Sequence, residues 1–189
     1  MRLKELRKRV SQPIFSTYQV EKLFPDEPKN QINVQLSRMA IRGDLLSLKK
    51  GIYIFDGETV DEMLVANLLY RPSYVSLETA LNLYGMMVDV PVNVTSVSPI
   101  TSKEITTGLG AFLYSRISRE LFFGFFKQES SHPGIFYNLA FAEKALLDYV
   151  YIRKVKDLRE NRIEVANLGK NRLKLLVKAY PNWVKRIFL

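Results

Sequence analysis

The first 57 residues constrain the fold most, because they contain two helical segments followed by two β-prone runs, with clear breaks between them. Ser16 and Gln19 have the spacing of a capping box, in which each side chain satisfies a free backbone N–H at the start of a helix. A short helix is therefore predicted to begin at this point. It is expected to end before residues 25–28, since the two prolines there cannot donate a helical hydrogen bond.

A second helical segment, residues 29–42, has one apolar and one polar face. Ile32, Leu36 and Met39 recur at the spacing of an amphipathic helix, and Gly43 is expected to end that helix in the left-handed conformation. Asparagine and glutamine can pair with adenine through two hydrogen bonds, and arginine can pair with guanine in the same way. The polar face carries side chains suited to reading DNA, namely Asn30, Gln31, Asn33, Ser37 and Arg38.

Two short β-prone runs follow, at residues 45–48 and 52–55. They are separated by Lys49, Lys50 and Gly51, so a hairpin with a basic tip is predicted. Helix, turn, helix and hairpin is the order of a winged helix-turn-helix, in which the second helix enters the major groove.

In that arrangement the basic hairpin would hold the DNA backbone. Lys49 and Lys50 are expected to contact phosphates from the wing, and Thr17 and Tyr18 are expected to contact them from the start of the first helix of the motif. The alternative is a small α+β module whose polar face is merely solvated.

The remaining residues, 58–189, mix helical and β patterns. Ser76 is expected to cap one of the helices, and the alternation of valine with polar residues in 92–98 is typical of a half-buried strand. The predicted helices span 58–70, 76–85 and 142–152, and the predicted strands span 92–98, 112–117, 121–126 and 135–139. The expected fold class is α+β, with a winged helix-turn-helix domain at 1–57 followed by a mixed α/β C-terminal domain at 58–189.

Composition indicates a folded protein of a reducing compartment. Hydrophobic residues make up 47% of the sequence, which lies well outside the composition of disordered chains. Cysteine is absent, so disulfides and thiolate metal sites are excluded. The first nine residues lack the apolar stretch of a signal peptide, and no apolar run approaches the roughly 18 residues that cross a bilayer. We therefore expect a cytoplasmic location.

The excess of basic residues is concentrated at the two ends of the chain. The net charge of +9 divides into +5 for residues 1–57, −4 for residues 58–150 and +8 for residues 151–189. The last segment interleaves its basic groups with apolar residues that include Tyr180 and Trp183. Two interpretations stay open: a surface for nucleic acid or an acidic partner, or a terminal helix packed on the second domain with a solvated basic face.

The sequence contains no recognisable catalytic constellation. His132, the only histidine, precedes Pro133 in a predicted turn and lacks further metal ligands at a set spacing. Glu143 and Asp148 lie five positions apart and do not stack on one helix face, so helix capping by Glu143 and surface pairing are expected of them. No phosphate-binding glycine loop or nucleophile elbow occurs. We expect no enzyme activity, no catalytic residue, no metal and no cofactor.

Four stretches make the sequence resemble the AbiEi-type antitoxins of abortive-infection systems. The most specific is residues 142–148, Ala-Glu-Lys-Ala-Leu-Leu-Asp, although this family commonly has a proline just before the Glu-Lys-Ala pattern and this chain has Ala142. The others are residues 36–45 with 50–53, residues 74–81, and residues 92–95. They follow one another in the order typical of the family and are spread over most of the chain.

The resemblance implies an antitoxin and transcriptional regulator with a role in phage defence. Such a protein represses its own toxin–antitoxin operon by binding promoter DNA, and its C-terminal domain counters a nucleotidyltransferase-like toxin, with or without a stable complex. The family has no assigned catalytic residues. The alternatives are a stand-alone transcriptional regulator and a winged-helix protein-interaction module whose basic C-terminal segment docks on an acidic surface.

Overall fold

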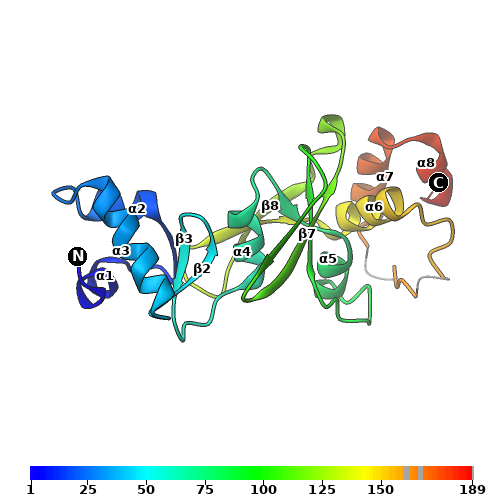
Figure 1. Cartoon of the computed structure of the whole chain (residues 1–189). Coiled ribbons are helices and arrows are strands. Elements are labelled where there is room, and N and C mark those ends of the chain that lie inside the picture. The colour runs from blue at the N-terminus through cyan, green and yellow to red at the C-terminus, as the bar shows by residue number, and fades with distance from the viewer. Residues whose placement is uncertain (160–161, 166–167, 189) are drawn as a thin grey trace. The chain divides into compact units, whose positions relative to one another are not determined.

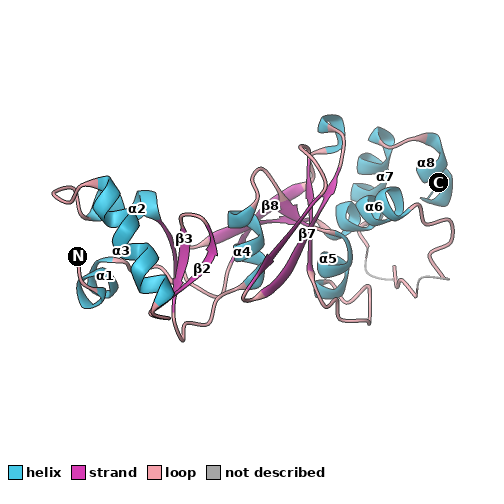
Figure 2. Cartoon of the chain, in the orientation of Figure 1, coloured by secondary structure: helices cyan, strands magenta, loops and turns pink. Residues whose placement is uncertain are grey.

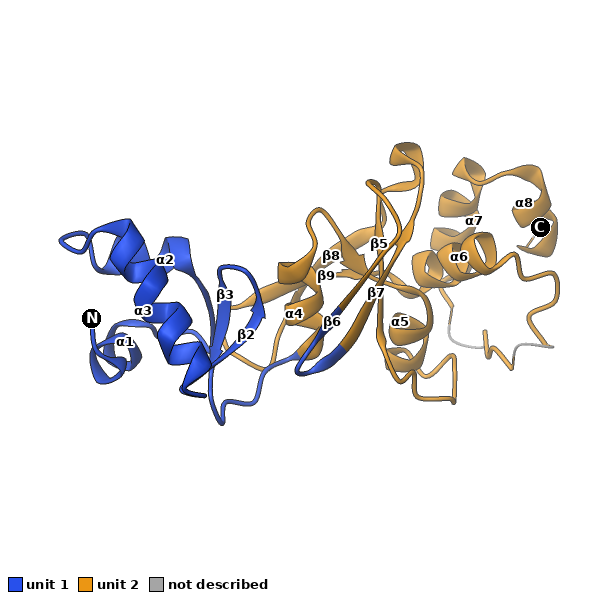
Figure 3. Ribbon diagram, viewed as in Figure 1, with its two compact units in different colours: residues 1–61, 106–110 blue, residues 62–105, 111–189 orange. Residues whose placement is uncertain are grey.

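The computed structural model describes residues 1–159, 162–165 and 168–188, and these form an α+β protein (Figures 1 and 2). The chain divides into two compact units (Figure 3). The first unit comprises residues 1–61 and 106–110, and the second comprises residues 62–105 and 111–189. The main division therefore follows Asp61. The boundary predicted from the sequence, after residue 57, lies four residues earlier.

The first unit contains three helices and a three-stranded antiparallel sheet among its described residues. Its strands lie in the order β1-β3-β2, and Ile14 pairs with Ile54 while Leu45 pairs with Phe55. Its elements are α1 (Leu3–Arg9), β1 (Ile14–Ser16), α2 (Thr17–Leu23), α3 (Lys29–Ile41), β2 (Leu45–Lys49) and β3 (Ile52–Phe55).

The predicted helix signals of this unit are confirmed. Gln19 donates its backbone N–H to Ser16 Oγ at 3.2 Å, and Ser16 donates its own N–H to Gln19 Oε1 at 2.7 Å, so the capping box is complete. Gly43 follows α3 with φ of +83°, the left-handed conformation expected of it. Ile32, Leu36 and Met39 all lie in the core of the unit.

Two elements of the first unit were not predicted. Helix α1 lies in a segment dominated by basic residues, and only Leu6 in it is buried. Strand β1 has three residues and pairs with the distant strand β3, where Ile52 lies opposite Ser16, 36 positions later in the sequence. Such short elements have too little periodicity to be recognised, and packing rather than propensity stabilises them.

The second unit is built on a six-stranded sheet with the strand order β6-β7-β5-β4-β9-β8. Strands β5 and β7 run parallel, as do β4 and β9, whereas β4 is antiparallel to β5 and β8 is antiparallel to β9. The strands are β4 (Tyr74–Val75), β5 (Val94–Ser98), β6 (Lys103–Thr107), β7 (Gly110–Arg116), β8 (Phe125–Glu129) and β9 (Phe136–Ala140).

Helices cover this sheet on both sides. Figure 2 shows α4 and α5 on opposite sides of the strands, and both helices pack against β5. The helices are α4 (Glu62–Leu69), α5 (Leu77–Leu83), α6 (Ala142–Arg153), α7 (Lys170–Leu176) and α8 (Asn182–Phe188), with 3₁₀ turns η1 (Arg119–Leu121) and η2 (Val177–Ala179). No helix in the described part of the chain is long and apolar enough to span a membrane.

Two predictions for the second unit are wrong. Strand β5 is buried at all five positions rather than at alternate ones, because it lies inside the sheet between two helices. The apolar run at 121–126 is not one strand, since η1 ends at Leu121 and β8 begins at Phe125. Gly124 between them has φ of +76°, which interrupts strand geometry.

Candidate functional site

The polar face of α3 lies on the surface of the first unit. The three apolar positions of the stripe are buried, so the opposite side of the helix faces solvent. All five predicted DNA-reading side chains are exposed: Asn30, Gln31, Asn33, Ser37 and Arg38. Asn33 also donates its side-chain amide to the Lys29 carbonyl at 3.0 Å. Arg38 pairs with no acidic side chain among the described residues.

The hairpin tip lies beside the start of α2. Thr17 donates its backbone N–H to the Gly51 carbonyl at 3.0 Å, which joins the two segments. Lys49 and Lys50 are both exposed at the tip. Tyr18 is 62% exposed, and its ring lies 4.5 Å from the ammonium of Lys22. The two lysines and Tyr18 can therefore meet a polyanion.

Thr17 differs from the other predicted contact residues. Its hydroxyl is buried and has no hydrogen-bond partner in the described part of the chain. A Cβ at Gly51 would lie 3.4 Å from that hydroxyl, so the hairpin turn covers it. Thr17 therefore joins the hairpin to α2 through its backbone, and its buried hydroxyl is not placed to contact a phosphate.

A second group of polar side chains surrounds Asp148 in the interior of the second unit. Oδ2 of Asp148 accepts hydrogen bonds from Tyr74 Oη at 2.8 Å and from Ser76 Oγ at 3.0 Å. Oδ1 accepts from Tyr180 Oη at 2.6 Å and pairs with the Lys144 ammonium. All five side chains are buried, and we call this set the Asp148 cluster.

Lys144 is the cation of the Asp148 cluster and is fully buried. Its ammonium donates to Tyr180 Oη at 2.6 Å and lies between 5.1 and 5.6 Å from the ring centres of Tyr180, Phe123 and Tyr74. Burial lowers the pKa of Lys144, while the negative charge of Asp148 opposes that shift.

The tyrosines of the cluster are held in their protonated form. Burial, together with the carboxylate of Asp148, raises the pKa of Tyr74 and that of Tyr180 far above the ordinary value. Each phenol is therefore a hydrogen-bond donor to Asp148 at neutral pH. The buried carboxylate has four donors, which is the condition for burying a charge without a large penalty.

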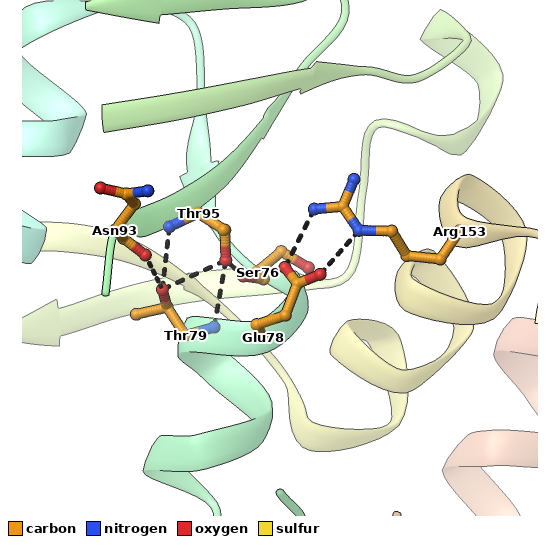
Figure 4. A network of polar contacts seen from close by, with 6 residues as sticks. All are labelled: Ser76, Glu78, Thr79, Asn93, Thr95 and Arg153. Carbon is orange, nitrogen blue, oxygen red and sulfur yellow. Dashed lines mark hydrogen bonds and ion pairs between the residues drawn. The ribbon is translucent and has the colours of Figure 1, made fainter. Parts of the chain in front are cut away.

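The predicted cap of α5 is wrong, because Ser76 belongs to this cluster. Its hydroxyl points to Asp148, and Thr95 on β5 takes over the capping role (Figure 4). Thr79 donates its backbone N–H to Thr95 Oγ1 at 3.0 Å, and Thr95 donates that hydroxyl to the Ser76 carbonyl at 2.8 Å. Figure 4 also shows the two-point ion pair between Glu78 and Arg153, which lies nearer the surface.

The expectation that Glu143 and Asp148 cap and pair at the surface is wrong as well. Glu143 is 4% exposed, and its Oε1 accepts the Gly169 backbone N–H at 2.9 Å, while Oε2 lies 3.6 Å from the guanidinium of Arg172. Glu143 therefore holds the start of α7, and Asp148 holds Tyr180 after η2. The side chains of α6 anchor the C-terminal segment to the unit.

Three of the four stretches that carry the family resemblance meet in this interior. Residues 74–81 supply Tyr74 and Ser76, residues 92–95 supply Thr95, and residues 142–148 supply both members of the ion pair. The last stretch is far from the other two in the sequence, and the hydrogen bonds from Tyr74 and Ser76 to Asp148 span more than 70 positions. Their shared role is to hold the second unit together.

The C-terminal segment combines features of both interpretations left open by its sequence. Val177, Tyr180 and Val184 are buried against the unit, as a packed terminal segment requires. Trp183 is 40% exposed and stacks on Tyr151 with ring centres 6.1 Å apart. It also lines a hollow of about 500 Å³ that has a basic rim, formed with Lys154, Lys156, Arg186 and Ile187.

The remaining candidate residue from the sequence is His132, which was considered as a metal ligand. His132 lies in a surface turn, where its Nδ1 is 3.2 Å from Ser131 Oγ. Among the described residues no three histidine or acidic side chains are grouped as metal ligands would be. Comparison of the chain with protein-family models and with curated proteins finds no match.

Proposed function

We propose that this protein is a DNA-binding transcriptional regulator and antitoxin, of the AbiEi type, which represses its own toxin–antitoxin operon. Its first unit would be a winged helix-turn-helix, with α2 and α3 as the motif and the β2–β3 hairpin as the wing. The order helix, strand, helix, helix and hairpin supports this assignment, as does the three-stranded antiparallel sheet.

One observation carries the proposal: the exposed side of α3 presents amides and an arginine, while a separate exposed tip presents two lysines. Side chains of the first kind read base edges, and those of the second kind neutralise phosphates. In the proposed complex Asn30, Gln31, Asn33, Ser37 and Arg38 face the major groove. Lys49, Lys50 and Tyr18 face the backbone, and Thr17 positions the hairpin.

The assignment as an antitoxin is supported by the family resemblance alone. The partner would be a nucleotidyltransferase-like toxin encoded next to this protein, and both would act in the cytoplasm. The antitoxin role predicts that a neighbouring gene encodes a nucleotidyltransferase. Expression of that nucleotidyltransferase should be toxic, and co-expression of this chain should relieve the toxicity. Co-expression that leaves the toxicity unchanged would contradict the antitoxin role while leaving the DNA-binding role standing.

Binding to a fragment of the protein's own promoter tests the DNA-binding role. We expect Arg38→Ala to weaken binding by about 1 to 3 kcal/mol and to relax specificity at one base pair, because one base-edge contact is lost. Lys50→Ala should weaken binding to all sequences and flatten the dependence of log K on log salt by about one unit.

The control is Lys127→Ala, which removes an exposed cation of β8 in the second unit. It should leave both the affinity and the salt slope unchanged. An apolar protein interface on the first unit would respond little to salt, whereas DNA binding should collapse between roughly 50 and 200 mM salt. Promoter binding that Arg38→Ala and Lys50→Ala leave intact would show that the face of α3 is not the DNA-binding surface.

A further inference from the structure

A hollow of about 860 Å³ lies in the second unit at the ends of two neighbouring strands. Strands β5 and β7 run parallel in register, with Ser98 opposite Arg116, so their carboxyl ends meet at one edge of the sheet. The next strand, β4, runs antiparallel to β5. In open α/β sheets, ligands bind in the crevice outside the carboxyl ends of the strands.

The lining of the hollow has an apolar part and a cationic part. Its residues come from the loop before β4, the turn after β5, the end of β7 and η1: Pro72, Pro99, Ile100, Arg116, Ile117, Ser118, Arg119 and Phe122. Phe122 is held in place by ring contacts with Tyr74 at 5.2 Å and with Phe125 at 5.2 Å. The aromatic wall is therefore fixed by the core of the unit.

The two arginines are the only charged groups among the residues that line the hollow, and both are exposed. Neither Arg116 nor Arg119 pairs with an acidic side chain anywhere in residues 1–159, 162–165 or 168–188. Ser118 adds a hydroxyl between them in the sequence. Both guanidinium groups are therefore available to bind an anion in the hollow.

The combination matches a specific class of ligand. Guanidinium groups bind phosphate through paired hydrogen bonds, and proline and aromatic side chains contact flat apolar rings. The volume lies within the range of roughly 300 to 1,000 Å³ that small-molecule sites occupy. A mononucleotide has a phosphate part and a flat base that fit the two parts of the hollow.

We propose that this hollow binds a nucleotide, with Arg116 and Arg119 holding the phosphates and the wall formed by Ile100, Pro72 and Phe122 contacting the base. The site lies wholly in the second unit, so it is independent of DNA recognition by α3.

Isothermal titration calorimetry of the full chain with ADP, GDP, CDP and UDP tests the site. At least one of the four should bind with a Kd below about 1 mM, and inorganic phosphate or the matching nucleoside should bind at least tenfold more weakly. Arg116→Ala and Arg119→Ala should each weaken binding about tenfold or more through the lost phosphate contact. Ile100→Glu, which places a carboxylate on a half-exposed side chain at the hollow, should abolish it.

Two sets of controls separate this site from general attraction to basic surfaces. Lys127→Ala should leave nucleotide binding unchanged, and so should Arg38→Ala and Lys50→Ala on the proposed DNA-binding surface. Loss of nucleotide binding in those variants, with retention in Arg116→Ala and Ile100→Glu, would overturn the proposal. Failure of all four nucleotides to bind the folded parent protein would overturn it as well, without affecting the promoter-binding result.

Discussion

The polar side chains of α3 and those of the Asp148 cluster differ in where their hydrogen-bond partners come from. On α3 the groups face solvent and are open to an external ligand. Around Asp148 they are buried, and every one is bonded to another member of the cluster. An exposed polar group exchanges water for a ligand at little cost to folding, whereas a buried group that loses its partner keeps its desolvation penalty. Polar groups on α3 can thus serve binding, while those around Asp148 serve stability.

The largest effect is expected for Asp148→Ala. The substitution leaves the Lys144 ammonium buried without its counter-charge, so the free energy of unfolding should fall by about 3 to 5 kcal/mol. Trp183, the single tryptophan, lies in the same unit and reports the transition in a denaturant titration followed by fluorescence. Glu78→Ala is the matched control, since it breaks a more exposed pair and should cost less than about 1 kcal/mol. Equal unfolding midpoints for Asp148→Ala and Glu78→Ala would show that the buried carboxylate stabilises the fold no more than the exposed one.

Alkaline pH should destabilise the second unit next most strongly. Burial raises the pKa of Tyr74, Tyr114 and Tyr180, so above pH 10 the unfolded chain loses phenolic protons that the folded chain keeps. The stability present below pH 10 should then fall by up to about 1.4 kcal/mol per pH unit for each tyrosine. Lys144 acts in the opposite direction, because its lowered pKa makes its burial less costly as the pH rises toward the unfolded value of about 10.5.

Phenolate absorbance and denaturant titrations between about pH 9 and pH 11 measure this effect together. These three phenols should ionise only as the fluorescence of Trp183 reports unfolding. Ionisation of all ten tyrosines in a chain that is still folded would show that the cluster is open to solvent.

A smaller loss of stability is expected for Thr95→Val, which removes one uncharged hydrogen-bonding group from the buried region. The Thr79 backbone N–H would lose its acceptor and α5 its cap, so the free energy of unfolding should fall by about 1 to 2 kcal/mol. Thr106→Val on β6 is the matched control, because that side chain is exposed and should change stability by less than about 0.5 kcal/mol. A Thr95→Val protein as stable as the control would show that α5 does not depend on this cap.

The smallest effect on folding is expected for Arg38→Ala. An exposed side chain without a partner in the described residues should change the free energy of unfolding by less than about 0.5 kcal/mol, even where promoter affinity falls. Measuring unfolding and DNA binding on one preparation separates the two properties. Destabilisation comparable with that of Asp148→Ala would mean that the polar face of α3 serves the fold.

The parts of the fold that the sequence predicted well are those that local rules govern. The Ser16–Gln19 capping box, the end of α3 at Gly43 and the exposed and buried faces of α3 all follow from residues within a few positions of one another. The helix at 142–152 was predicted within one residue of its observed ends for the same reason. Because these signals are local, the candidate DNA-binding face could be proposed before its surroundings were known.

The roles of Glu143, Lys144 and Asp148 could not be predicted in this way. Charged residues at the start of a helix usually lie at the surface, and the i, i+4 spacing of Lys144 and Asp148 is common in solvated ion pairs. Their burial depends on Tyr180, 32 positions after Asp148, and on Tyr74, 74 positions before it. The nucleotide-sized hollow depends in the same way on strands that only the folded chain brings together.

The sequence by itself determined where α2 begins, where α3 ends and which face of α3 is polar, because hydrogen bonding and periodicity act over a few residues. Only the tertiary structure decided which charged groups are buried, which side chain caps α5, and where two arginines meet an aromatic wall. Those outcomes depend on the partners that the fold supplies from distant segments, and the energy of a polar group is set by whether such a partner is present.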